Sequence, residues 1–118
     1  MANPNIVNVA TINGKTDVFA LTTTETDLVT ATANTVFKIN SILVSNIDGT
    51  NAADVTIKYN DGSNDRAIAS TISVPADATL AVVDKNSSIY LEETEKITGT
   101  ASANSDLECL ISYEIISD

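Results

Sequence analysis

The stretch VFKINSILVSNIDGTNAADVTIKYNDGSND, residues 36–65, decides the fold class of this chain. In its second half, Val55, Ile57 and Tyr59 alternate with polar residues. Such alternation is typical of a β-strand that has one buried face and one solvated face. The stretch therefore predicts β-structure, and the rest of the chain can be compared with it.

The first half of the same stretch predicts a second strand, with Ile39, Leu43 and Ile47 on its buried face because they share one parity. Asp48-Gly49 lies between the two strands, and such a pair usually closes a hairpin because glycine accepts a positive φ. The two strands are therefore expected to pair with each other. Residues 60–65, NDGSND, repeat this turn chemistry and close the second strand.

Short β-rich segments, separated by turn residues, continue along the chain: Ile6–Ile12, Thr16–Thr22, Asp27–Ala33, Ala67–Val74, Thr79–Val83, Ile89–Leu91, Lys96–Ala101 and a final strand from Leu107. In that final strand every second residue is apolar. No segment carries an apolar stripe at helical spacing, so little or no helix is expected. About eight to ten short strands predict an all-β, single antiparallel β-sandwich, with either a jelly-roll or an immunoglobulin-like strand order.

The length of 118 residues suits one domain. Residues 1–5 are expected to form a flexible N-terminal arm, and residues 6–118 a single β-sandwich domain. The first residues have neither a basic segment nor a long apolar run, so no secretory signal is expected.

The charge balance is acidic, with 6 Lys and Arg against 16 Asp and Glu, a formal net charge of −10. Affinity for nucleic acid depends chiefly on Lys and Arg contacts to phosphate, so nucleic acid is not an expected partner. An anionic membrane is not expected either. The acidity favours either a simple solvated surface or docking onto a basic partner.

No catalytic or cofactor-binding residues are expected. The chain has no histidine, which is the commonest general base and metal ligand. Cys109 is the single cysteine and shares parity with Leu107 and Ile111, so it is predicted to be a core residue and not a nucleophile. Glu92, Glu93 and Glu95 lie together, but nothing predicts a pocket that would separate their pKa values, so a solvated turn is favoured. An enzyme is therefore not expected.

The two loops at residues 46–51 and 60–65 gather Asp and Asn oxygens around a glycine. Calcium requires such oxygen ligands, but neither loop has the spacing of a calcium loop with a distal bidentate Glu. Asp and Asn also stabilise turns by accepting bonds from their own backbone. Turns are the favoured reading, with calcium as the alternative, and no metal or other cofactor is expected.

Some strands carry apolar residues on both parities, which suggests that part of the outer surface contacts another chain. The alternative is a fully covered central strand. The candidate interface residues are Ile6, Val7, Val9, Val36, Ile42, Val44, Leu110 and Ile116.

Three segments resemble small virion structural proteins of tailed bacteriophages, of the type met in phages of marine and cyanobacterial hosts. They are SILVSNIDGTNAADVTIKYND (Ser41–Asp61), SVPADATLAVVDKNSSIYLEETEKI (Ser73–Ile97) and TASANSDLECLISYEIIS (Thr100–Ser117). The motifs are structural: a hairpin, a Val-Pro-linked strand, an I-Y-L-E-E edge and a final I-S-Y-E strand. The first third of the chain matches less distinctly.

This resemblance implies a capsid decoration (cement) protein that is made in the host cytoplasm and located on the capsid surface of the virion. It implies the major capsid protein as partner and a homo-oligomer, with a trimer favoured, at capsid symmetry axes. Alternatives are a tail, neck or fibre-associated structural protein, and a host-surface or carbohydrate-binding β module. A heptad or repeated shaft would favour the former, and exposed aromatic residues the latter; the chain has only five Phe and Tyr residues and no Trp.

Overall fold

Nine β-strands and one turn of 3-10 helix make up the computed structural model, which describes residues 3–118. The elements are β1 (Thr11–Ala20), β2 (Thr26–Thr30), β3 (Thr35–Asn46), β4 (Ala53–Asn60), β5 (Asp65–Val74), β6 (Thr79–Val83), η1 (Lys85–Ser87), β7 (Ile89–Leu91), β8 (Lys96–Ala101) and β9 (Leu107–Ser117). Among residues 3–118 there is no helix long and apolar enough to cross a bilayer.

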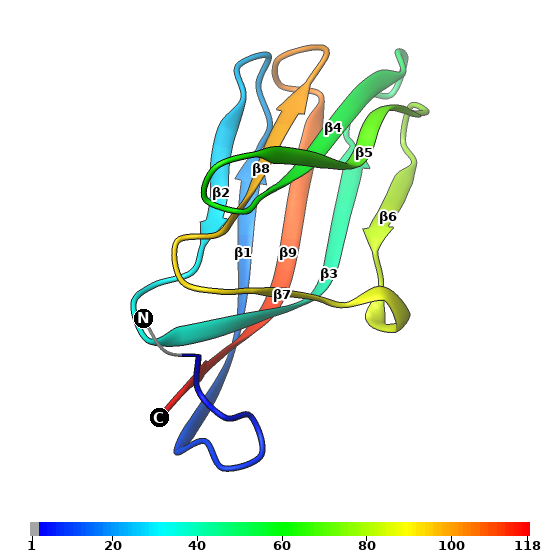
Figure 1. Cartoon of the computed structure of the whole chain (residues 1–118). Helices are drawn as coiled ribbons and strands as arrows, with labels where there is room; N and C mark the ends of the chain where they lie inside the picture. The colour runs from blue at the N-terminus through cyan, green and yellow to red at the C-terminus, as the bar shows by residue number, and fades with distance from the viewer. Residues whose placement is uncertain (1–2) are drawn as a thin grey trace.

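The strands form two antiparallel sheets that pack face to face (Figure 1). The first sheet has the order β1-β9-β3-β6, with β7 also paired to β3 below β6. The second has the order β2-β8-β4-β5. The predicted all-β antiparallel sandwich is therefore confirmed.

The strand order is that of a jelly roll, which decides between the two orders that the sequence left open. The antiparallel pairs are nested: β4 pairs with β5, β3 with β6 and β7, β2 with β8, and β1 with β9. This is one long antiparallel ribbon. Rolling it up brings β9 against β3 and β8 against β4, and these contacts close the two sheets.

One apolar core fills the space between the sheets. Its fully buried side chains come from both sheets, among them Ile39 and Ile111 from the first and Val55 and Ile57 from the second. The rings of Phe37 and Tyr113 stack, with centroids 5.2 Å apart. The core side of β9 consists of Leu107, Cys109, Ile111 and Tyr113, as the alternation predicted.

A bulge at Asn40 changes which parity of β3 faces the core. The pairing of β3 with β9 shifts register between Ile39 and Ser41. Odd-numbered residues such as Ile39 face inward before the bulge, and Ile42 and Val44 face inward after it. An extra residue in one strand has this effect because side chains alternate with a period of two. The prediction that Leu43 and Ile47 share a buried face with Ile39 is therefore wrong.

The connection at Asp48-Gly49 is not a hairpin, contrary to the sequence-based prediction. β3 and β4 belong to different sheets, so residues 47–52 cross the top of the sandwich. Buried Asn46 holds this crossing, because its side chain donates to the carbonyls of Asn51 (3.0 Å) and Val74 (2.9 Å) and accepts from the N–H of Asp48 (2.9 Å). The second turn, between Asn60 and Asp65, does close a hairpin, that of β4 and β5.

The start of the chain also differs from expectation. Residues 6–10 form turns and bends, and β1 then runs without interruption through Asn13-Gly14, the pair that was expected to separate two strands. Met1 and Ala2 of the expected arm lie outside the described residues. Pro4 is buried, and Asn3 donates a hydrogen bond to Glu92.

Candidate interaction surfaces

The residues predicted from two-sided strands divide into a buried and an exposed set. Ile42 and Val44 are completely buried in the core, because the bulge at Asn40 turns them inward. Val36 and Ile116 are 5% and 4% exposed. These four residues are therefore corrected from interface candidates to buried residues.

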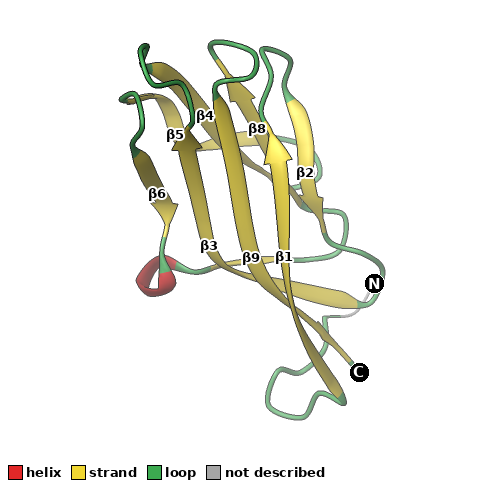
Figure 2. Ribbon diagram, turned by 180° about the vertical axis from the view of Figure 1, so that it is seen from behind, coloured by secondary structure: helices red, strands yellow, loops and turns green. Residues whose placement is uncertain are grey.

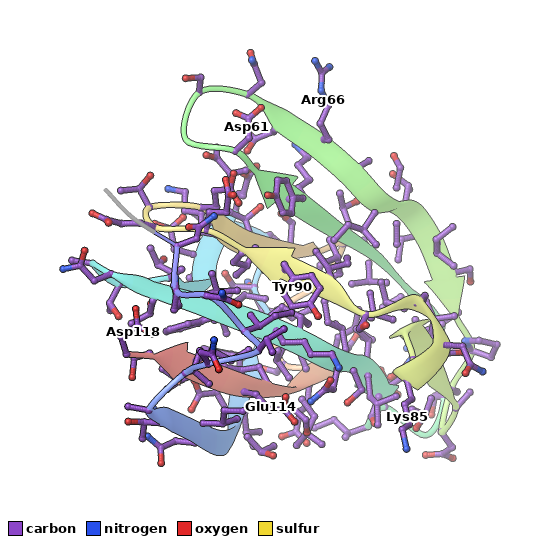
Figure 3. The ribbon with its side chains drawn as sticks, turned by 60° about the horizontal axis from the view of Figure 1, so that its bottom comes forward. Asp61, Arg66, Lys85, Tyr90, Glu114 and Asp118 are labelled. Carbon is purple, nitrogen blue, oxygen red and sulfur yellow. The ribbon has the colours of Figure 1, made fainter. Side chains whose placement is uncertain are left out.

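Val36 and Ile116 point outward but are covered at the lower end of the first sheet. They face each other in register, with Ile12 of β1 on the far side of Ile116. Pro4 and Ile6 of the N-terminal segment lie over Val36, together with Tyr90, around a hollow of about 300 Å³. Figure 3, viewed from this end, shows Tyr90 on β7 and Glu114 on β9.

Ile6 and Val7 form the first exposed apolar surface, here called the N-terminal knob. Their side chains are 51% and 84% exposed, whereas Val9 is half-buried. The knob sits on a defined turn: Asn5 accepts the N–H of Val7 on its side chain (3.0 Å) and that of Asn8 on its carbonyl (3.0 Å). An apolar side chain that is held in water by a defined turn is available to a partner.

A second apolar surface crosses the outer face of the first sheet, and Figure 2 looks onto this face. Cross-strand register places Val18 beside Leu110, Leu110 beside Leu43, and Leu43 beside Ala81. We call these four residues the apolar row. Val18 is 64% and Leu110 37% exposed, Ala81 is exposed and Leu43 is half-buried. In Figure 2 no described segment lies in front of the middle of β1, β9, β3 and β6, the four strands that carry the row.

Small or polar residues border the apolar row on both sides. On one side are Thr16, Ser112 and Ser41; on the other are Ala20, Glu108, Ser45 and Thr79. Hydroxyl pairs bond across the strands: Thr16 and Ser112 lie 3.0 Å apart, and Ser45 and Thr79 lie 3.1 Å apart. Together, the four residues of the apolar row and these seven bordering residues include one charged side chain, that of Glu108.

The outer face of the second sheet is different, because its side chains form ion pairs in solvent. Lys58 pairs with Glu25 at 3.4 Å, and Lys96 with Asp27 at 3.1 Å. Exposed pairs of this kind contribute little stability but keep a face hydrated. The two faces of the sandwich thus differ in chemistry, and the apolar row lies on the less charged one.

Leu110 is the one predicted interface residue within the apolar row. Sequence reasoning missed Val18, although its neighbour Phe19 packs against the core from the opposite parity, which is the same two-sided signal. It missed Leu43 because the bulge was not predicted.

The two acidic loops act as turns. The Asp48 carboxylate accepts the N–H groups of Thr50 (2.8 Å) and Asn51 (3.3 Å), and that of Asp61 accepts those of Ser63 and Asn64. These backbone bonds lower the pKa of both carboxyls below the ordinary value. Figure 3 shows Asp61 at the tip of the β4–β5 hairpin.

The remaining ionisable side chains that the sequence singled out have structural surroundings. Cys109 is fully buried, and the loss of hydration raises the pKa of its thiol to about 12. Glu95 accepts bonds from the Tyr59 hydroxyl and from the N–H of Glu92, which ties the turn after β7 to β4. Burial and this carboxylate raise the pKa of Tyr59.

The fold defines a jelly-roll sandwich, a class that unrelated structural and binding proteins share.

Neither a family model nor a curated protein matches the chain. Several solved structures match the fold, among them two whose match covers 92% of this chain. One, from work on Bacillus endospore appendages that form disulfide-linked pili, has a TM-score of 0.55 and 13% identity, with 88% of that chain covered. The other belongs to the acid-stable capsid of Helicobacter pylori bacteriophage KHP30, with a TM-score of 0.54, 6% identity and 90% covered. At these identities the likeness is one of fold alone.

Proposed function

We propose that this protein is a non-enzymatic structural component of a phage particle, and that it decorates the capsid by binding the lattice of the major capsid protein. The resemblance of three segments between Ser41 and Ser117 to phage virion structural proteins carries this proposal, since a jelly roll by itself does not define a function. Capsid domains are among the proteins that use this fold. The capsid neighbour at a TM-score of 0.54 is consistent with such a role.

The surface chemistry supports attachment. A decoration protein needs a compact unit that presents contact surfaces, and this chain holds Ile6 and Val7 in water at one end of an acidic sandwich. We assign the contact with the capsid protein to this N-terminal knob. Each contact is small, but many copies arranged around capsid symmetry axes, as trimers or other oligomers, add to the stability of the head through multivalency.

Co-sedimentation tests the placement. Purified protein is mixed separately with intact heads and with isolated tails, and the bound amount is measured as its concentration rises. We expect saturable binding to heads at a fixed ratio to the major capsid protein. Binding to tails alone would move the protein to the tail or neck, and binding to neither would contradict a virion role and favour a host-surface module.

A matched pair of variants tests the knob. Val7→Asp places a charge on the 84% exposed side chain and is expected to weaken head binding at least about tenfold, because the carboxylate would lose hydration in the contact. Ile47→Asp is the control. Ile47 is 55% exposed and directly follows β3, whereas the N-terminal segment lies at the start of that strand, beside Val36; this variant is expected to bind normally. Equal binding by the two variants would remove the knob from the contact.

A further inference from the structure

We propose that the apolar row is a self-association surface, on which two copies of this chain pack face to face about a two-fold axis. The row consists of Val18, Leu110, Leu43 and Ala81 and spans the four strands β1, β9, β3 and β6. This contact involves a different surface from the knob and does not depend on the virion role.

Charge argues for a second copy as the occupant of this face. Two molecules of net charge −10 repel each other, so a contact between two copies is favoured where few charges face one another. The row and its two borders contain one of the 16 acidic residues of the chain, Glu108, and no basic residue. A basic partner would find few carboxylates here, whereas a copy of the same face meets little repulsion.

The position of Glu108 defines the direction of the axis. An axis that lies between the two faces and runs along the row places each row residue near its own mate, with Leu110 on Leu110. The same rotation places each border of the row over the opposite border of the other copy. Glu108 of one copy therefore lies over the hydroxyl of Ser112 in the other. Because Glu108 is two residues from Leu110, the two carboxylates lie about 13 Å apart along the strand, beyond the screening length of about 8 Å.

The size of the face predicts weak association. Four strands and three rows cover about 300 Å² per copy, whereas a stable interface buries about 800 Å² per partner. The free protein should therefore be mainly monomeric at micromolar and increasingly dimeric at millimolar concentration. A weak two-fold contact of this kind becomes effective where copies are held close together.

Analytical ultracentrifugation tests self-association directly. The mean mass is expected to rise with concentration from the 12.4 kDa of one chain toward twice that value. Leu110→Glu is expected to raise the dissociation constant at least about tenfold, since the charge is buried in both copies. Ile72→Glu is the control, because Ile72 is 40% and Leu110 37% exposed but Ile72 lies on β5 of the second sheet. Thermal unfolding of both variants checks that they are folded.

Chemical cross-linking tests the axis without a disruptive substitution. Facing sheets are about 10 Å apart, a distance that a short bismaleimide spans. Leu110→Cys is expected to give a covalent dimer with this reagent, and Ala67→Cys, on exposed β5, is not. The native thiol of Cys109 is buried and does not interfere. A monomeric mass up to millimolar concentration, or equal cross-linking at both positions, would overturn the proposal.

Discussion

Asn46 determines how the chain passes from one sheet to the other. It is 3% exposed, and its amide bonds to three backbone groups of the segments that meet at the top of the sandwich. A buried amide is stable only when such bonds are made, since an unpaired buried polar group costs free energy.

We expect Asn46→Ala to lower the free energy of unfolding by about 2 to 4 kcal/mol, because it leaves two carbonyls and one N–H without partners. Urea titration measures this change. Asn13→Ala is the control: Asn13 is exposed on β1, and its replacement should change stability by less than about 0.5 kcal/mol. Similar effects of the two substitutions would show that the Asn46 bonds do not hold the crossing.

The turn carboxylates Asp48 and Asp61 predict a loss of stability in acid. Their pKa values are lowered in the folded chain by backbone N–H groups, so their contribution is present above the ordinary pKa of 3.8 and is lost as the pH falls through the lower folded value. We expect the melting temperature of Asp48→Asn/Asp61→Asn to fall less than that of the wild type between pH 5 and pH 2, both values being approximate. Parallel curves would contradict this account.

At the scale of the strand, two glycines have opposite surroundings. A Cβ at Gly99 in β8 would lie 2.8 Å from Leu28 Cδ1 and 3.1 Å from Leu21 Cδ2, so the glycine lets these core side chains approach the strand. At Gly14 in β1 a Cβ would meet nothing within 4 Å.

We therefore expect Gly99→Ala to destabilise the protein by about 1 to 3 kcal/mol through overpacking. Gly14→Ala should instead raise stability by about 0.5 kcal/mol, because it restricts the unfolded chain without a clash. Thermal and urea unfolding measure both. A stabilising Gly99→Ala would mean that Leu28 moves aside without cost.

The long strand β3 shows why parity alone does not determine a face. Its twelve residues pair with β9 along one edge and with β7 and then β6 along the other. The bulge at Asn40 lets the strand bend between these two partners, and the core side changes parity there. Leu43 thereby becomes part of the outer row, and Ile42 and Val44 become part of the core.

For the whole molecule, net charge and self-association are linked. Two copies of charge −10 repel through solvent even where the contact itself is uncharged, and salt screens this repulsion. We expect the dimer proposed above to become tighter as salt is raised from about 0.02 M to about 0.5 M, where the screening length falls from roughly 20 Å to 4 Å. Sedimentation at several salt concentrations measures the trend, and weaker association in salt would indicate that ion pairs hold the contact.

The amino-acid sequence by itself determined the class of the fold. Period-two alternation, glycine and asparagine turns and the lack of helical stripes are local signals, and they predicted an all-β antiparallel sandwich and the buried side of β9. The burial of Cys109 followed in the same way. Such features depend on neighbouring residues, so they can be read without knowledge of distant contacts.

Only the tertiary structure decided the strand order, the crossing at Asp48-Gly49 and the outward surface. The jelly roll depends on pairs such as β1 with β9, which join residues about a hundred positions apart, and no local pattern encodes them. A one-residue bulge then reversed the face of half a strand, which moved Val44 into the core and Leu43 outward. The physical reason is that a side chain's exposure depends on what the rest of the chain places against it.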